Sequence, residues 1–170
     1  MIRLRPTMAS DLDFVLSVER DASNLPFITP WERTQHEAAI RFPDFRHFII
    51  EGGPELNAVG FLILIGCRSR HQSLELKRMV VQAKGSGFGR AALRVAKKVA
   101  FDDLGAHRFW LDVKARNTRA KSLYDGEGFV VEGKLRDAVK MADGFDSLIV
   151  MSMLQHEFTE RRNLGLEMRA

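Results

Sequence analysis

Cysteine is almost missing from the chain. The 170 residues include a single one, Cys67, so no disulfide can form within the chain. Because it lies in the apolar stretch from Phe61 to Cys67, we expect Cys67 to be a buried strand residue. The five histidines are scattered and do not combine with Cys or Asp at metal-ligand spacing. We therefore expect neither a disulfide scaffold nor a metal site.

Long hydrophobic runs are missing as well. No apolar run approaches the roughly 18 residues that suggest a membrane-spanning helix. The first six residues, from Met1 to Pro6, also lack the apolar core of a signal peptide. We therefore expect a cytoplasmic protein with no membrane partner.

Charge of one sign is not concentrated anywhere in the chain. The net charge of +4 would suit an anionic partner, but basic and acidic residues are interleaved over most of the sequence. Binding of nucleic acid favours a clustered basic stripe with aromatic residues between, and the nearest approach to one is Arg161-Arg162. No nucleic acid partner is predicted.

What remains is an ordinary globular composition. Hydrophobic residues make up 45% and charged residues 28% of the chain, which argues against a disordered protein. A chain of this length can be organised around one hydrophobic core. Since no repeat or linker divides it, we expect a single domain over residues 1–170, with a polar C-terminal tail from about residue 158.

Hydrophobic periodicity predicts a mixed α/β fold. Alternation with period two indicates strands, and apolar residues three and four positions apart indicate helices. The expected order is a strand at 2–5, two helices between 10 and 42, a hairpin of 47–50 and 59–65, a strand at 74–81, a helix at 89–105, a strand at 109–113, a short helix at 117–124, and strands at 129–132 and 147–154.

The strand at 74–81 changes phase in its middle. Leu74 and Leu76 alternate in one phase and Met79 and Val81 in the other, with Lys77-Arg78 between them. One extra residue produces such a shift, and a β-bulge inserts one. A frayed amphipathic strand is the equal alternative.

A glycine-rich loop separates that strand from the next helix. In Lys84-Gly85-Ser86-Gly87-Phe88-Gly89, the glycines let backbone amides point toward one place at the helix N-terminus, where a phosphate can bind. Neither Gly-Lys-Ser/Thr nor the dinucleotide spacing Gly-x-Gly-x-x-Gly is present. The loop therefore predicts a phosphate site of another kind, with a plain structural turn as the alternative.

This loop resembles the coenzyme A signature of the GCN5-related N-acetyltransferase (GNAT) family, Gln/Arg-x-x-Gly-x-Gly/Ala. Lys84, Gly87 and Gly89 match it, with lysine in the first position. The segment 117–129 is similar to the family's Asn...Ala...Leu-Tyr...Gly-Phe element. The resemblance implies an acyl-CoA N-acyltransferase fold: a mixed, mostly antiparallel central sheet of about seven strands, splayed at the cofactor site, with about four helices.

The resemblance also implies acetyl-CoA as the acetyl donor. Main-chain groups of the strand after the bulge would hold the pantetheine and the acetyl carbonyl, and loop amides would hold the pyrophosphate. Asn117 is equally well explained as a helix N-cap. The implied cofactor-binding residues are Met79, Val80, Val81, Lys84, Gly85, Ser86, Gly87, Phe88, Gly89, Arg90 and Asn117.

Acetyl transfer needs a neutral amine as nucleophile and a proton for the leaving thiolate. By resemblance Tyr124 supplies that proton, and a phenol with a pKa of about 10 is protonated at neutral pH; a core tyrosine of the short helix is the alternative. Glu75 lies near where some family members place a carboxylate base, although an exposed strand glutamate is the alternative. The implied reaction is direct attack by a primary amine in a ternary complex, and the alternative is a non-catalytic acetyl-CoA sensor.

The acceptor is left open between a small amine and a protein N-terminus. Residues 144–154 loosely resemble the branch that includes ribosomal-protein N-terminal acetyltransferases. Glu19, Asp21, Asn24 and Trp31 fall in the segment that resembles the family's variable acceptor wall, with solvated surface and core as alternatives. A homodimer is also left open.

Overall fold

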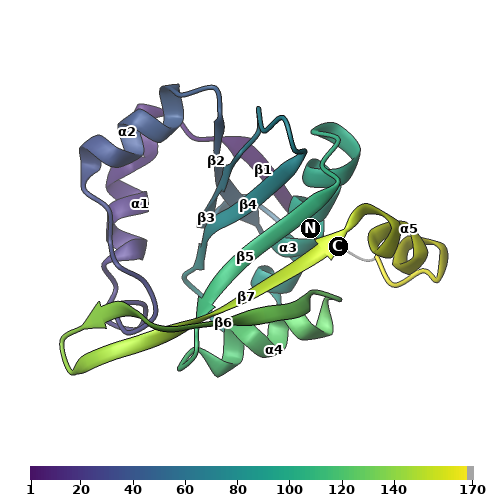
Figure 1. Cartoon of the computed structure of the whole chain (residues 1–170). Coiled ribbons are helices and arrows are strands. Elements are labelled where there is room, and N and C mark those ends of the chain that lie inside the picture. Colours follow the sequence, from purple (N-terminus) through teal and green to yellow (C-terminus); the bar gives the residue numbers. More distant parts are fainter. Residues whose placement is uncertain (168–170) are drawn as a thin grey trace.

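A computed structural model describes residues 1–167. One seven-stranded sheet runs through it in the order β1-β2-β3-β4-β5-β7-β6 (Figure 1). Only the β4–β5 pair is parallel, so the predicted mixed, mostly antiparallel sheet is confirmed. The strands are β1 (Ile2–Pro6), β2 (Phe45–Gly52), β3 (Asn57–Ile65), β4 (Ser73–Val81), β5 (Arg108–Lys114), β6 (Val130–Met141) and β7 (Gly144–Leu154).

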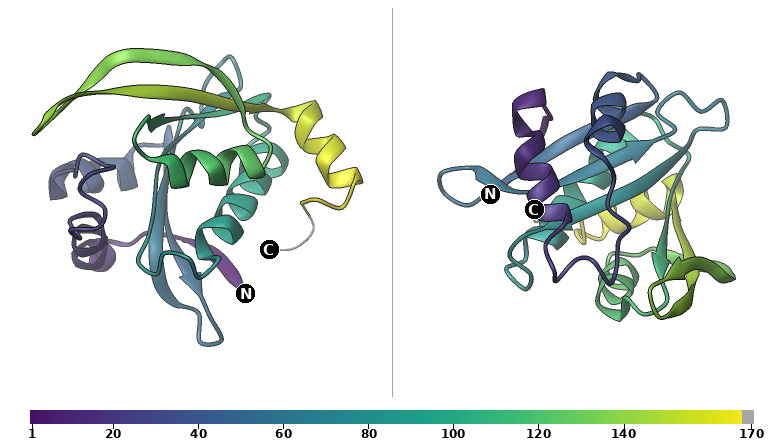
Figure 2. Two further views of the ribbon diagram at one scale, coloured as in Figure 1. Left: turned by 90° about the horizontal axis from the view of Figure 1, so that it is seen from below. Right: turned by 90° about the vertical axis from the view of Figure 1, so that its left-hand side faces the viewer.

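Helices cover both faces of the sheet (Figure 2). The helices are α1 (Leu12–Glu19), α2 (Arg33–Arg41), α3 (Phe88–Lys98), α4 (Thr118–Gly126) and α5 (Gln155–Asn163). The first two lie on one face, and α3 and α4 lie on the other. The fifth helix, one more than the four expected, occupies the segment for which a polar tail was predicted. It buries Phe158 against Phe101, with ring centroids 4.8 Å apart. No helix among residues 1–167 is long and apolar enough to cross a membrane.

Strand β3 is buried on both faces because helices cover both. Phe61 and Ile63 pack into the hydrophobic cluster on the α1 side, and Leu62 and Leu64 pack into the larger cluster on the α3 side. Successive side chains of a strand point to opposite faces, so this central strand is a nearly continuous apolar run. This buried strand pairs with β4 and holds it in place, and the end of β4 borders the site.

The predicted bulge is present in β4. Ile63 of β3 faces Arg78, but the next residue, Leu64, faces Leu76, which leaves Lys77 as the extra residue. Strand β4 then pairs with β5 only over the short stretch 73–75. Beyond that point the two strands separate, which confirms the predicted splay.

One expectation about local structure is wrong, and another is confirmed with a change in helix type. Cys67 lies in a turn after β3 and is only partly buried, because Gly66 ends the strand with a φ of 91°. The helix expected over 89–105 ends its α-helical part at Lys98 and continues as a wider π-helical turn over 99–103. Gly105, the last residue of the expected range, follows that turn and ends the helix with a φ of 64°.

Candidate active site

A cavity of about 620 Å³ occupies the opening between β4 and β5. Its walls come from the end of β4, the glycine-rich loop, helix α4 as far as Tyr124 and the segment between α1 and α2. The predicted site residues that line it are Met79, Val80, Val81, Lys84, Gly85, Gly87, Gly89, Arg90, Asn117 and Tyr124. The two motifs, about 30 positions apart in the sequence, therefore meet in one space.

Three predicted residues do not line the cavity. The hydroxyl of Ser86 donates to the carbonyl of Ala83 at 2.6 Å. The ring of Phe88, the first residue of α3, lies beside Gly52 at the end of β2. Glu75 lies in the paired part of β4 and forms an ion pair with Lys77 at 3.4 Å.

The glycine-rich loop has the shape of an anion cradle. Gly85 and Gly87 adopt left-handed conformations, with φ of 86° and 85°, which side chains rarely adopt. Gly87 directly precedes α3, and a Cβ built on it would meet no atom within 4 Å. The first amides of a helix have no partner within the helix, and those of α3 belong to a segment that lines the cavity through Gly87, Gly89 and Arg90. Such an N-terminus favours phosphate.

Basic side chains surround this cradle. Lys84 donates to the carbonyl of Ser23 at 2.6 Å, so it joins the loop to the segment after α1. Arg90 is about half exposed and lies 3.5 Å from Glu127. The guanidinium of Arg119 lies beside Gly85, 3.5 Å from where a Cβ would stand. Arg119 was missed in the sequence, because its position two residues after Asn117 carries no signal until α4 folds against the loop.

Tyr124 forms part of the cavity wall. The residue is 8% exposed, and its ring packs against Phe129 at 5.8 Å. Burial, and then the negative charge of Asp112, raises the pKa of Tyr124 to about 12. The phenol is therefore protonated at neutral pH and can donate a proton into the cavity.

Asp112 is a second carboxylate near the opening. It is exposed on β5, and its charge raises the pKa of Tyr124 and also that of Glu75. The pKa of Glu75 is raised chiefly by burial, against the opposing effect of Lys77. Sequence reasoning missed Asp112, although its alternation with Leu111 and Val113 places it on the opposite face of β5 from the core.

Asn117 caps α4. Its side-chain oxygen accepts a hydrogen bond from the amide of Ala120 at 3.2 Å, as an N-cap residue does. The residue also lines the cavity. The geometry accounts for the capping role, while a contact with the cofactor stays a prediction.

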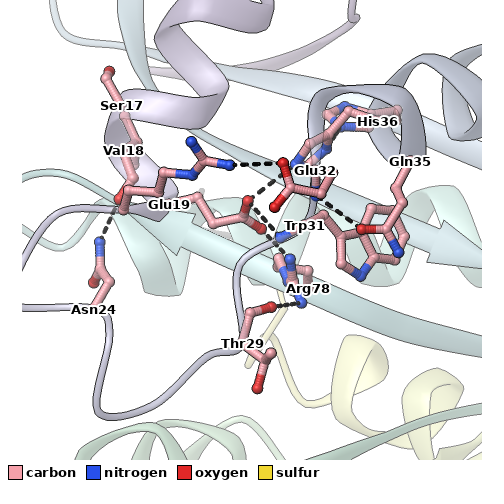
Figure 3. A network of polar contacts seen from close by, with 12 residues as sticks. Ser17, Val18, Glu19, Asn24, Thr29, Trp31, Glu32, Gln35, His36 and Arg78 are labelled. Atoms are coloured by element: carbon pink, nitrogen blue, oxygen red, sulfur yellow. Dashed lines mark hydrogen bonds and ion pairs between the residues drawn. The ribbon is translucent and has the colours of Figure 1, made fainter.

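The proposed acceptor wall holds a buried polar network (Figure 3). The carboxylate of Glu19 is fully buried and accepts hydrogen bonds from the amide of Trp31 at 3.0 Å and from the side chain of Arg78. Arg78 also donates to the carbonyl of Thr29 at 2.8 Å, and its guanidinium lies 5.0 Å from the Trp31 ring centroid. Glu19 and Trp31 thus belong to a structural network at the β4 bulge.

The other two wall residues differ in burial: Asn24 is buried and Asp21 is exposed. Asn24 donates to the carbonyl of Val18 at 2.8 Å and lines the cavity. Asp21 accepts from the amide of Ser23 at 2.9 Å, and the hydrogen bonds from Ser23 lower its pKa. Of the four residues, only Asn24 lines the cavity.

The network continues through two histidines. His36 lies 3.0 Å from Glu19 and 3.0 Å from His47, whose other ring nitrogen lies 2.8 Å from the hydroxyl of Thr7. Burial, and then the neighbouring His36, lowers the pKa of His47 to about 3. His47 is therefore neutral near pH 7, and this chain of hydrogen bonds fixes α2 against β2.

Comparison with known proteins identifies the family. The model for the acetyltransferase (GNAT) domain matches residues 2–130. A spermidine N(1)-acetyltransferase from Vibrio cholerae is 27% identical over 168 residues, which cover 94% of this chain and 96% of that protein.

Solved structures of similar proteins share the fold. A chimera of the Vibrio cholerae spermidine N-acetyltransferase SpeG and hSSAT superposes with a TM-score of 0.85 at 25% identity, over 94% of this chain and 99% of the other. The Vibrio cholerae enzyme in complex with CoA and spermine superposes with a TM-score of 0.84 at 24% identity, over 93% and 98%. The chain belongs to the GNAT acetyltransferase family, and it transfers an acetyl group from acetyl-CoA to a primary amine.

Proposed function

We propose that the amine attacks acetyl-CoA directly in a ternary complex in the opening between β4 and β5, with Tyr124 protonating the leaving thiolate. The observation that carries this is the position of Tyr124. Its phenol stands in the wall of the same cavity as the glycine-rich cradle, and its pKa of about 12 keeps it protonated. A proton donor placed at the leaving group contributes about 10²- to 10⁴-fold to rate.

The cofactor would lie along the free edge of β4. After Glu75, this edge pairs with no other strand among residues 1–167, so backbone groups of Met79 to Val81 that face away from β3 have no strand partner. Buried backbone groups require hydrogen-bond partners, and the amides of a pantetheine chain can supply them. The amides at 85–90 would then hold the pyrophosphate.

Removal of the amine proton falls to a carboxylate. Glu75 has a raised pKa, which suits a base, but it does not line the cavity. We therefore assign Glu75 a role through an intervening water, with Asp112 as the second carboxylate near the phenol. Neither carboxylate is needed for acceptors that are already partly neutral at the working pH.

The acceptor is a small primary amine in this proposal. The relatives act on spermidine by name, but none of the residues that line the cavity in the described part of the chain is Asp or Glu. Attraction of a polycation favours a wall of acidic side chains, and the two carboxylates near the opening, Glu75 and Asp112, lie outside this lining, so we do not carry the polyamine over as the preferred substrate. A protein N-terminus, a homodimer and a cytoplasmic location stay predictions.

Replacing Tyr124 by Phe tests the mechanism and the sensor alternative together. Thiol release from acetyl-CoA with an active amine should fall about 10²-fold or more in kcat. Affinity for acetyl-CoA, measured by calorimetry, should stay the same, because only one hydroxyl is removed. An unchanged kcat would exclude Tyr124 as the acid, and a chain that binds acetyl-CoA but turns over no amine would be a sensor.

A further inference from the structure

Lys114 is a nearly buried lysine without a counter-ion. It is the last residue of β5 and is only 8% exposed. Its ammonium makes no hydrogen bond or ion pair with any residue in the range 1–167. Lysine is almost never buried unless it is paired, and the ammonium of Lys114 keeps some contact with solvent, so a ligand can reach it and supply the missing partner.

The side chain of Lys114 lies on the face of the sheet that α1 and α2 cover. Phe109, Leu111 and Val113 pack into the core on the α3 side. Because side chains alternate along a strand, Lys114 shares the opposite face with Asp112. Lys114 and Asp112 do not line the cavity themselves, but Arg116, two residues further on, does. Lys114 therefore stands beside the open end of the splay.

Burial and three charged residues act on the pKa of Lys114. Burial lowers the pKa of Lys114, Asp146 opposes this, and the positive charges of Arg116 and Arg78 lower it further. Asp146 is already bound to Arg116 at 3.0 Å, and Arg78 is bound to Glu19. Asp146, the acid that raises the pKa of Lys114, is thus already paired with Arg116. Lys114 would therefore stabilise an added anion.

We propose that Lys114 binds a carboxylate of the acceptor, so that the preferred substrates are amino-carboxylates rather than polyamines. This inference rests on the proposed function, since it concerns the acceptor of the same reaction. Asp112 and Lys114 lie two residues apart on one face of β5, about 7 Å along the strand at 3.3 Å per residue. A negative and a positive group at that spacing match a molecule that carries both an ammonium and a carboxylate.

Matched pairs of acceptors test the inference on the unaltered protein. Lysine and cadaverine differ only by the carboxylate, as do ornithine and putrescine, and spermidine serves as the polyamine. Thiol release from acetyl-CoA should show a kcat/KM at least about tenfold higher for the amino acid of each pair, the effect of one charge-assisted hydrogen bond. Short peptides with an acidic second residue, compared with their amide counterparts, show whether a peptide carboxylate serves as well.

Variants of Lys114 connect the preference to this residue. In Lys114→Gln the advantage of the carboxylate should disappear, mainly through KM, while Lys114→Arg should keep most of it. The exposed lysine at the end of α3, Lys98, provides the control Lys98→Gln, which should keep the full preference. Affinity for acetyl-CoA should be the same in all of them.

The outcomes distinguish the carboxylate inference from the proposed function on which it rests. Equal kcat/KM within each pair, or a preference for spermidine, overturns the carboxylate inference and leaves acetyl transfer intact. If Lys114→Gln does not fold, the acceptor pairs still decide. If the protein binds acetyl-CoA but releases no thiol with any of these acceptors, the proposed function itself is overturned.

Discussion

Glu19 and Arg78 form an ion pair that joins the end of α1 to the bulge of β4, with side chains 0% and 8% exposed. Burial alone would raise the pKa of Glu19, but the hydrogen bond from His36 and the charge of Arg78 lower it overall. Arg78 directly precedes Met79, the first residue of the strand edge on which we place the cofactor. The pair therefore fixes the wall of the cavity relative to that edge.

Replacing Glu19 by Gln should strongly destabilise the fold. The change leaves the guanidinium of Arg78 buried without its anion, which costs about 3–5 kcal/mol in the free energy of unfolding. Urea denaturation measures this directly. The control is Glu32→Gln, which breaks an exposed ion pair with Arg20 at 3.3 Å and should cost about 0–1 kcal/mol. Equal losses in the two variants would show that the buried pair contributes no more to stability than the exposed pair.

The sequence predicted those features that depend on neighbours along the chain. The phase change in β4 predicted the bulge, because one inserted residue shifts every following side chain to the other face. The glycines at 85–89 predicted the loop, because a left-handed backbone next to a helix start is a local property. Both lie where the motif resemblance was strongest.

The features that the sequence did not predict depend on contacts between distant segments. Glu19 and Arg78 are 59 positions apart, and no spacing rule connects them. In the sequence, Lys114 is one of the polar residues of an amphipathic strand. Its burial beside the splay, and the lack of a free acid among residues 1–167 to pair with it, become visible only in the folded chain. Cys67 was assigned to a strand because an apolar run carries no sign of where pairing ends.

Stability should fall as the pH is lowered, because of His47. Its pKa is about 3 in the folded protein, against 6.5 for the ordinary side chain, so the unfolded chain binds a proton between these values that the folded chain does not. The contribution is complete above about pH 6.5 and is lost toward pH 3, with a slope of up to about 1.4 kcal/mol per pH unit.

Urea denaturation at several pH values between about 5 and 7 measures that slope, in a range where most carboxylates stay ionised. His47→Gln should flatten it. His71 is exposed, and His71→Gln should leave the slope unchanged. A slope that survives in the His47 variant would assign the effect to another group.

The cradle can be tested apart from backbone strain. Gly87 and Gly53 have φ of 85° and 83°, and a Cβ on either would meet no atom within 4 Å. Valine at either position should therefore cost a similar amount of stability, about 1–3 kcal/mol. Only Gly87→Val should weaken binding of acetyl-CoA in calorimetry, by tenfold or more, because its side chain blocks the amides at the start of α3. Similar affinities in both variants would argue against the cradle.

Gly60 tests the role of the β4 backbone. A Cβ on Gly60 would lie 2.1 Å from the carbonyl oxygen of Val80 and 2.9 Å from the Cα of Val81, so Gly60→Ala forces β4 away from β3. We expect a loss of about 1–3 kcal/mol in stability, as for overpacking, together with weaker binding of acetyl-CoA. Gly133→Ala on β6, where a Cβ meets nothing within 4 Å, should change neither. A Gly60 variant that is destabilised but binds acetyl-CoA normally would show that the cofactor does not depend on the position of this edge.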